Sequence, residues 1–279
     1  MDFPRARAAA ARLDVLAQTG STNADLRSHA DDPADWPHLS VLMTANQTAG
    51  RGRLDRTWVA PPGASLAVSV LVRELPASPD ARGWIPLAAG EAMAGAIAAQ
   101  LPGLSVGVKW PNDVLAGDGS DAARKICGIL AEVAGNAIIV GSGVNTAMAA
   151  EQLPVPGATS FAVLGADVDQ DRLIADYLKS FDAHLSALAA ADDAVLSGLH
   201  ALVTARCVTL GLDVRVSLPG DRTMEGTASR LDAGGRLMVV VDGAEHPISA
   251  GDVVHVRPID SDTPGAPPGM SAGAGTIEG

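Results

Sequence analysis

Two apolar runs separated by a polar segment constrain the fold of this chain more than any other feature. The first run covers residues 41–43, and the second, residues 66–72, is rich in valine. Both runs predict β-strands, because β-branched side chains pack well on a pleated surface. The segment between them, residues 47–58, holds three arginines and two glycines. We therefore predict a loop that joins two strands at the edge of a sheet.

The composition of this loop predicts anion binding. Gly50 and Gly52 allow the backbone N–H groups to approach a ligand closely. Arg51, Arg53 and Arg56 add permanently charged, forked donors that suit carboxylate and phosphate groups. Together they indicate a site for a small ligand with several negative charges. The alternative is a solvated surface turn, which is common for loops between strands.

The rest of the pattern predicts a mixed sheet with helices. Strands are expected at residues 13–17, 40–45, 65–72, 106–115, 125–133 and 137–141, with a proline that interrupts the fourth. Helices are expected at residues 22–30, 84–100, 169–190 and 192–205. The first dozen residues predict only a frayed helical arm, which is too short for a DNA-binding helix-turn-helix.

A change in composition near Arg206 divides the chain. Residues 1–205 form the larger predicted domain. Residues 206–258 contain short apolar runs between glycine turns, which predict a small SH3-like β-barrel. Residues 259–279 are rich in proline, glycine and serine without an apolar period, so we predict a disordered tail.

Charge and cysteine content argue against several classes of function. With 20 basic and 32 acidic residues the net charge is −12, whereas nucleic-acid binding requires a basic face. No stretch reads as a signal peptide or membrane span, and Cys127 and Cys207 have no CxxC partner. We therefore expect a reducing cytoplasm, no disulfide and no structural zinc. P-loop, dinucleotide-binding and zincin motifs do not occur, so any ATP site is of another kind.

Five motifs occur in a fixed order along the chain. They are Ser21-Thr22-Asn23, the loop from Gly50 to Trp58 preceded by Gln47, Lys109-Trp110-Pro111-Asn112-Asp113, the run from Lys125 to Glu132, and Gly141-Ser142-Gly143-Val144-Asn145. In this order they closely resemble the biotin protein ligase family, in its form without an N-terminal DNA-binding domain. The resemblance implies an α+β fold, with a class II aminoacyl-tRNA-synthetase-like mixed sheet and helices followed by the SH3-like β-barrel. Residues 1–205 would then be the catalytic domain that binds biotin and ATP.

The resemblance also implies a two-step reaction. The biotin carboxylate attacks the α-phosphate of ATP, with Mg²⁺ as the accompanying ion, to give biotinyl-5'-AMP and pyrophosphate. A lysine of a biotin carboxyl carrier domain of an acyl-CoA carboxylase then takes the biotinyl group. Biotin and ATP are substrates, and no tightly bound prosthetic group, nucleic-acid partner or membrane partner is expected.

Site residues follow from the same resemblance, motif by motif. The catalytic candidates are Lys125, Arg53, Arg51 and Asp113. The candidates for biotin binding are Ser21, Thr22, Asn23, Gln47, Gly50, Arg51, Gly52, Arg53, Trp58, Lys125, Gly128 and Leu130. The candidates for ATP binding are Arg51, Arg53, Arg56, Lys109, Asn112, Lys125 and Asn145. Two anions must meet in the first step, so cations that bind both would lower their repulsion and align them. No metal ligand is assigned, although Asp113 could lie near Mg²⁺.

Simpler structural roles remain open for several of these residues. Ser21 or Thr22 could serve only as a helix N-cap, and Lys125 could be a surface lysine at the start of a strand. Asn112 and Asp113 could be plain turn residues. Asn145 could be a left-handed turn residue after a strand.

Two further functions and two loop properties also stay open. A lipoate or octanoate ligase or transferase on the same fold is one alternative function, and a biotin-adenylate-binding sensor is another. Asp55 departs from the small residue usual in the family's loop and could pair with Arg53 or Arg56. We expect the loop to be mobile without its ligand, because ordering each residue costs about 1–2 kcal/mol.

Overall fold

The computed structural model describes residues 2–53, 56–119, 123–218, 222–249 and 252–255. The predicted tail at 259–279, Asp55 and the centre of the 47–58 loop lie outside the described residues. None of the described helices is both long and apolar enough to cross a membrane.

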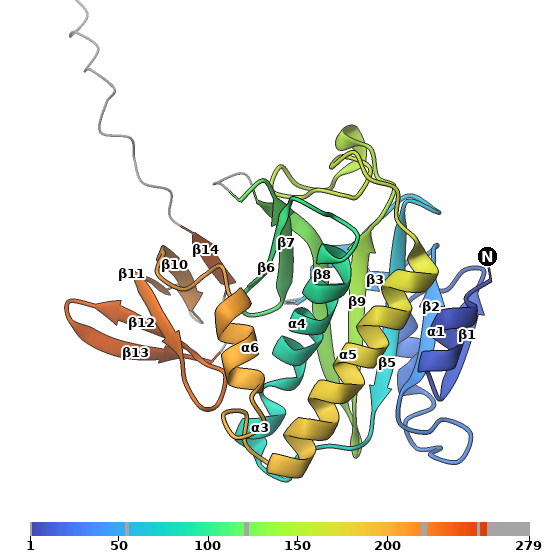
Figure 1. Ribbon diagram of the computed structural model, residues 1–279, viewed down its shortest axis with the longest axis horizontal. Coiled ribbons are helices and arrows are strands. Elements are labelled where there is room, and N and C mark those ends of the chain that lie inside the picture. Colours follow the sequence, from blue (N-terminus) through green and yellow to red (C-terminus); the bar gives the residue numbers. More distant parts are fainter. Residues whose placement is uncertain (1, 54–55, 120–122, 219–221, 250–251, 256–279) are drawn as a thin grey trace, which may run out of the picture.

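A seven-stranded sheet forms the body of the molecule (Figure 1), with the strand order β1-β2-β5-β9-β8-β7-β6. These strands are β1 (Arg12–Leu16), β2 (Ser40–Thr44), β5 (Ser65–Val72), β6 (Ser105–Lys109), β7 (Asp113–Gly117), β8 (Arg124–Ala134) and β9 (Ala137–Asn145). β1 and β2 are parallel and the other neighbours are antiparallel, so the predicted mixed sheet is confirmed. The expected place of the 47–58 loop is wrong, because β2 and β5 pair inside the sheet and not at its edge.

Two long helices cover one face of this sheet. α4 (Ile85–Ala98) is buried almost all round, as its apolar composition predicts, and α5 (Gln170–Ala191) packs beside it (Figure 1). The short α1 (Pro4–Ala9) lies against α5, where Ala6 is buried and its N–H donates to Asp171 Oδ1 at 2.9 Å. The expectation of a frayed arm is therefore wrong, since buried packing fixes this helix.

The opposite face of the sheet carries α2 (Thr22–Arg27). Leu26 of α2 packs into a small apolar cluster with Trp36, Leu42, Leu71 and Ile139. This cluster covers only part of the face and leaves the rest of β5, β8 and β9 accessible. Two two-residue strands, β3 (Gly50–Arg51) and β4 (Thr57–Trp58), pair as a hairpin above the accessible part.

The connection to the last part of the chain differs from the expected helix at 192–205. Asp192 ends α5 in a left-handed conformation, and Gly198 has a φ of +82°, so α6 (Leu199–Arg206) begins only after it. A short helix, α3 (Pro79–Arg82), and a 3-10 turn at Ala150–Gln152 complete the helical elements that the structure describes.

A second, antiparallel sheet follows, with the order β13-β12-β11-β10-β14. Its strands are β10 (Asp213–Leu218), β11 (Arg222–Leu231), β12 (Leu237–Val241), β13 (Ala244–Ile248) and β14 (Asp252–His255). Two indole N–H groups join it to the body of the molecule: Trp84, at the start of α4, donates to Ala233 O at 2.7 Å, and Trp110, after β6, donates to Gly235 O at 2.9 Å. The 233–235 turn is thereby tied to the start of α4 and to the segment that connects β6 and β7.

Candidate active site

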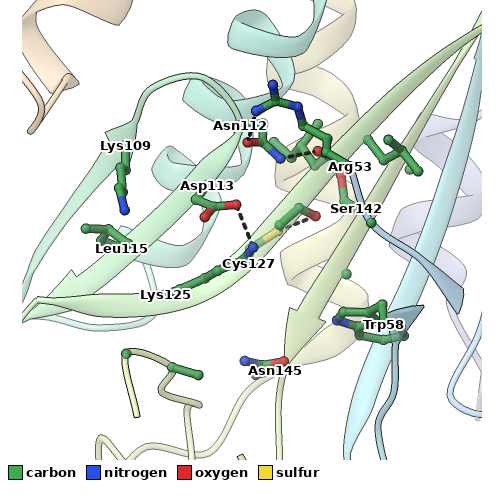
Figure 2. Close-up of a pocket in the computed structure, with 18 of the residues that line it drawn as sticks. Arg53, Trp58, Lys109, Asn112, Asp113, Leu115, Lys125, Cys127, Ser142 and Asn145 are labelled. Carbon is green, nitrogen blue, oxygen red and sulfur yellow. Dashed lines mark hydrogen bonds and ion pairs between the residues drawn. The ribbon is translucent and has the colours of Figure 1, made fainter. Parts of the chain in front are cut away.

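A cavity of about 1330 Å³ lies along the accessible part of the sheet, under the β3–β4 hairpin. Figure 2 shows Lys109, Asp113 and Lys125 on one side of it and Trp58 on the other. Every residue named above as a candidate for the site lines this cavity except Gly50. Gly50 lies just outside it, where a Cβ atom would be 2.5 Å from Gln47 Nε2 and 2.6 Å from Trp58 O. The cavity exceeds the roughly 300–1,000 Å³ of common small-molecule pockets, which suits an elongated ligand or two ligands side by side.

The floor of the cavity is made of glycine. Gly128 in β8 pairs with Gly143 in β9, and Gly141 lies two residues away on the same face. A Cβ atom at Gly141 would be 2.3 Å from Asn23 Oδ1, and one at Gly143 would be 2.9 Å from the Trp58 ring. The absence of side chains thus lets Asn23 and Trp58 lie directly on the sheet. Gly141 and Gly143 were not predicted as site residues, although glycines at every second position of a strand are a readable signal.

A β-bulge directs Lys125 into the cavity. Val114 pairs with Cys127 but Leu115 pairs with Lys125, so Ile126 is an extra residue in β8. Ile126 and Cys127 both face the helical core, and Lys125 therefore shares the face of Gly128. With regular alternation Lys125 would point into the core with Cys127. Lys125 therefore lies near the start of β8, as expected, and its side chain, which is 39% exposed, enters the cavity.

The Lys125 ammonium forms an ion pair with Asp113. Its Nζ lies 2.6 Å from Asp113 Oδ1, and a Cβ atom at Gly128 would be only 2.9 Å from that nitrogen. Lys109 enters the same cavity from the end of β6. Burial lowers the pKa of Lys109, Asp113 raises it, and Lys125 lowers it further by repulsion. A bound anion would offset the desolvation of the charged Lys109 and its repulsion by Lys125, because a nearby opposite charge stabilises an ammonium group.

Arg53 and Asn112 connect the loop to the β6–β7 turn. Arg53 Nη1 donates to Asn112 Oδ1 at 3.0 Å, and Asn112 Nδ2 donates to Ile129 O at 2.7 Å (Figure 2). Burial lowers the pKa of the Arg53 guanidinium, Asp113 raises it and Arg56 lowers it. Asn112 and Asp113 are therefore more than turn residues. The Asn112 side chain contacts Arg53 of the loop and Ile129 of β8, and the Asp113 carboxylate pairs with Lys125 of β8.

A polar cluster occupies the other end of the cavity, at the start of α2. Ser21 caps the helix by accepting from the Ala24 N–H at 3.4 Å, as the capping interpretation predicts. Thr22 donates its N–H to Gln47 Oε1 at 2.9 Å and its hydroxyl at 3.1 Å. The Ser69 hydroxyl of β5, which was not predicted, lies 2.7 Å from Thr22 Oγ1 and 2.5 Å from Asn23 Oδ1, and these two oxygens share its single proton.

Asn145 is the last residue of β9 and lies below the Lys125 ammonium group in Figure 2. Its Nδ2 donates to Thr159 O at 2.9 Å, and the residue is a regular part of the strand. The alternative of a left-handed turn residue is therefore wrong. Val155 and Ala158, which the motifs did not indicate, line the cavity beside it and form an apolar surface.

Both cysteines are buried and free. Burial raises the pKa of the Cys127 thiol to about 12 and also raises that of Cys207. We expect neither thiol to react with a water-soluble disulfide reagent at pH 8 in the folded protein, because the thiolate is the reactive form. Both should react after unfolding in guanidinium chloride. Rapid reaction of one thiol per folded chain would contradict this arrangement.

Comparison with known proteins shows the family. Residues 15–145 match the model of the biotin/lipoate A/B protein ligase family. The biotin–acetyl-CoA-carboxylase ligase of Mycobacterium tuberculosis is 43% identical over 249 residues, which cover 88% of this chain and 90% of that protein. The chain belongs to the biotin protein ligase family. The bifunctional ligase/repressor BirA of Escherichia coli is 31% identical over 74% of the chain and 63% of its own length.

Solved structures of biotin protein ligases have the same fold. The Aquifex aeolicus enzyme in complex with biotin and ATP superposes with a TM-score of 0.70 at 22% identity, over 88% of this chain and 99% of that one. The Leishmania major enzyme in complex with biotinyl-5-AMP gives a TM-score of 0.57 at 26% identity, over 86% of this chain and 99% of that one. The α+β architecture of this biotin protein ligase is thus shared with proteins that bind these ligands.

Proposed function

We propose that this biotin protein ligase activates biotin with ATP to biotinyl-5'-AMP and transfers the biotinyl group to a lysine of a biotin carboxyl carrier domain of an acyl-CoA carboxylase. The observation that carries this proposal is the position of Lys125. Its ammonium lies between Asp113 and the glycine floor, in a cavity with a polar cluster at one end and cationic side chains at the other. A carboxylate and a phosphate can meet there.

In the first step a biotin carboxylate oxygen attacks the α-phosphorus, and the bond to the bridging oxygen of pyrophosphate breaks. Lys125 Nζ would contact both the carboxylate and the α-phosphate, which lowers their repulsion and stabilises charge that develops during attack. Arg53, Arg56 and Lys109 would hold the remaining phosphate oxygens. Asn145 and the neighbouring apolar surface of Val155 and Ala158 would receive the adenine.

Biotin would lie flat on the glycine floor. Its bicyclic head has a ureido group that needs donors and acceptors, and Thr22, Asn23 and Gln47 offer both. Trp58, whose ring lies against the backbone at Gly143 in this structure, would move off the floor and cover the apolar part of the ligand. Such a closed site excludes water from the mixed anhydride.

In the second step the carrier amine attacks the biotinyl carbonyl carbon, and AMP leaves. Asp113 already holds one ammonium group in this structure, that of Lys125, at 2.6 Å. We infer that it orients the incoming carrier lysine in the same way and receives its proton. Asp113 would also suit Mg²⁺, which commonly binds one or two carboxylates together with water and substrate phosphates. The ion would neutralise phosphate charge.

The finer architecture and location are part of the proposal. Residues 1–205 would carry the class II synthetase-like domain, and residues 206–258 the SH3-like barrel. A reducing cytoplasm suits the two free, buried thiols. A net charge of −12 supports the absence of a nucleic-acid partner.

A transfer assay tests this function. The protein is incubated with Mg-ATP, a purified carrier domain and either biotin, lipoate or octanoate, and the mass of the carrier is measured. We expect a biotinyl increment on one lysine, and none when that lysine is replaced by arginine. Modification by lipoate or octanoate alone would overturn the proposal. Adenylate that forms and is never transferred would favour a sensor.

The glycine floor gives a further prediction. Gly141→Ala places a methyl group against Asn23 and should raise the KM for biotin about tenfold or more, because overpacking costs about 1–3 kcal/mol. The KM for ATP should change little. Gly95→Ala is the matched control, since its Cβ position in α4 has no atom within 4 Å. An unchanged biotin KM in Gly141→Ala would contradict the placement of biotin beside Asn23.

A further inference from the structure

Glu132 accepts side-chain hydrogen bonds from three donors on two elements, α2 and β3. It lies in β8 on the same face as Gly128 and Leu130, and its side chain is only 16% exposed. Its Oε2 accepts from Asn23 Nδ2 of α2 at 2.7 Å and from Arg51 Nη2 of β3 at 3.1 Å. Its Oε1 accepts from Arg27 Nη2 at 2.9 Å. The proposed reaction gives this carboxylate no chemical role.

The contact with Asn23 fixes the orientation of that amide. Asn23 Nδ2 donates to Glu132 and approaches Leu130 O at 3.3 Å, while Asn23 Oδ1 accepts from Ser69. An amide turned by half a revolution would place its oxygen against the carboxylate, which is repulsive. Glu132 therefore fixes the Asn23 amide with its nitrogen, the donor, toward β8 and its oxygen, the acceptor, toward Ser69.

The contact with Arg51 anchors the β3–β4 hairpin to the sheet. Arg51 pairs with Thr57 across the hairpin, and the next residue, Trp58, lies on Gly143. An ion pair between β3 and β8 therefore holds the strand pair that carries the indole over the floor. Release of Arg51 would leave the hairpin with one fewer attachment to the body of the protein.

We propose that Glu132 is a positioning residue that couples the polar cluster at the start of α2 to the β3–β4 hairpin. It does so through Asn23 on one side and Arg51 on the other. This inference rests on the proposed function and deepens it. Glutamine at position 132 keeps an oxygen acceptor for Asn23 but removes the charge that holds Arg51. Alanine removes both contacts. The two variants should therefore differ in a defined way.

Stopped-flow release of biotinyl-5'-AMP and steady-state KM values separate these effects. Glu132→Gln should release the adenylate about tenfold faster, the loss expected for one charge-assisted hydrogen bond, while the KM for biotin stays within about twofold. Glu132→Ala should show the faster release and also a KM for biotin raised about tenfold. Arg51→Gln should release the adenylate as fast as Glu132→Gln, and the double variant no faster than either.

Arg27→Gln is the matched control, because Arg27 pairs with the same carboxylate, is 45% exposed and does not line the cavity. It should leave both quantities unchanged. The proposal is overturned if Glu132→Gln and Glu132→Ala have equal effects on the KM for biotin, if Arg27→Gln reproduces them, or if the Arg51 and Glu132 effects simply add. Unchanged release in a folded Glu132→Gln would equally overturn it. Absence of any adenylate in the wild-type protein would instead reject the proposed function itself.

Discussion

Lys125→Arg is expected to lower the rate of adenylate formation by a factor of about 100 or more, the loss typical of a removed transition-state donor. Lys125 Nζ sits directly above Gly128 and 2.6 Å from Asp113 Oδ1. A planar guanidinium is larger than an ammonium and spreads its donors in a fixed fork, so it cannot occupy this position. Retention of positive charge should therefore not rescue the reaction.

Exchange of labelled pyrophosphate into ATP, dependent on biotin, measures this step. Lys179→Arg is the matched control, since Lys179 is exposed on α5 and lies outside the cavity. We expect its exchange rate to equal that of the wild type. If Lys125→Arg exchanged pyrophosphate at more than about one third of the wild-type rate, a positive charge at this position would suffice. The exact placement of the Lys125 ammonium would then not matter for the reaction.

Arg53→Ala should form the adenylate and then lose it, with a dissociation rate about tenfold or more above wild type. Arg53 joins the loop to the β6–β7 turn through Asn112, across the cavity. Removing this side chain opens that connection while Lys125, Asp113 and the glycine floor remain in place. The first step can therefore still occur, but the product is less enclosed.

Gel filtration of a preformed complex, with labelled adenylate followed against time, gives the dissociation rate. Arg172→Ala serves as the control, because Arg172 lies exposed on α5 and pairs only with Asp176 among the ion pairs that the structure describes. Retention of the label equal to wild type in Arg53→Ala would count against a role in enclosing the adenylate. If Arg53→Ala formed no adenylate at all, Arg53 would be required for the first chemical step.

The sequence predicted those elements whose pattern is local. The strand at 65–72 is observed with the same bounds, and the proline in 106–115 separates β6 from β7 as expected. The apolar helix at 84–100 is the buried α4, and the capping role of Ser21 is confirmed. In each case the side-chain pattern and the backbone preference agree, so little depends on the remainder of the chain.

The features that tertiary contacts determine were not predicted. α1 is fixed by α5, more than 160 residues away in the chain, and a short helix without such a partner would fray. The bulge at Ile126 reverses the alternation of β8, and no residue type marks its position. Trp110 belongs to a site motif, yet its indole points to Gly235 in the second sheet.

Most candidate residues of the site were found by motif, whereas their arrangement was not. Arg51 and Arg53 are two residues apart in the predicted loop and were assigned the same ligands. In the structure they have different partners, Glu132 and Asn112, on different strands and turns. Ser69 lies outside every motif, and Glu132 ends the motif that begins at Lys125 but received no role in the site. Only the fold brings both residues to Asn23.

The most direct test of the central claim is native mass spectrometry of the protein incubated with biotin and Mg-ATP. We predict a non-covalent adduct with the mass of biotinyl-5'-AMP, which disappears when a carrier domain is added as the carrier gains one biotinyl group. The same experiment with lipoate should give no adduct. An adduct with lipoyl-AMP, a covalent acyl group on the protein itself, or no adduct with biotin would contradict the account.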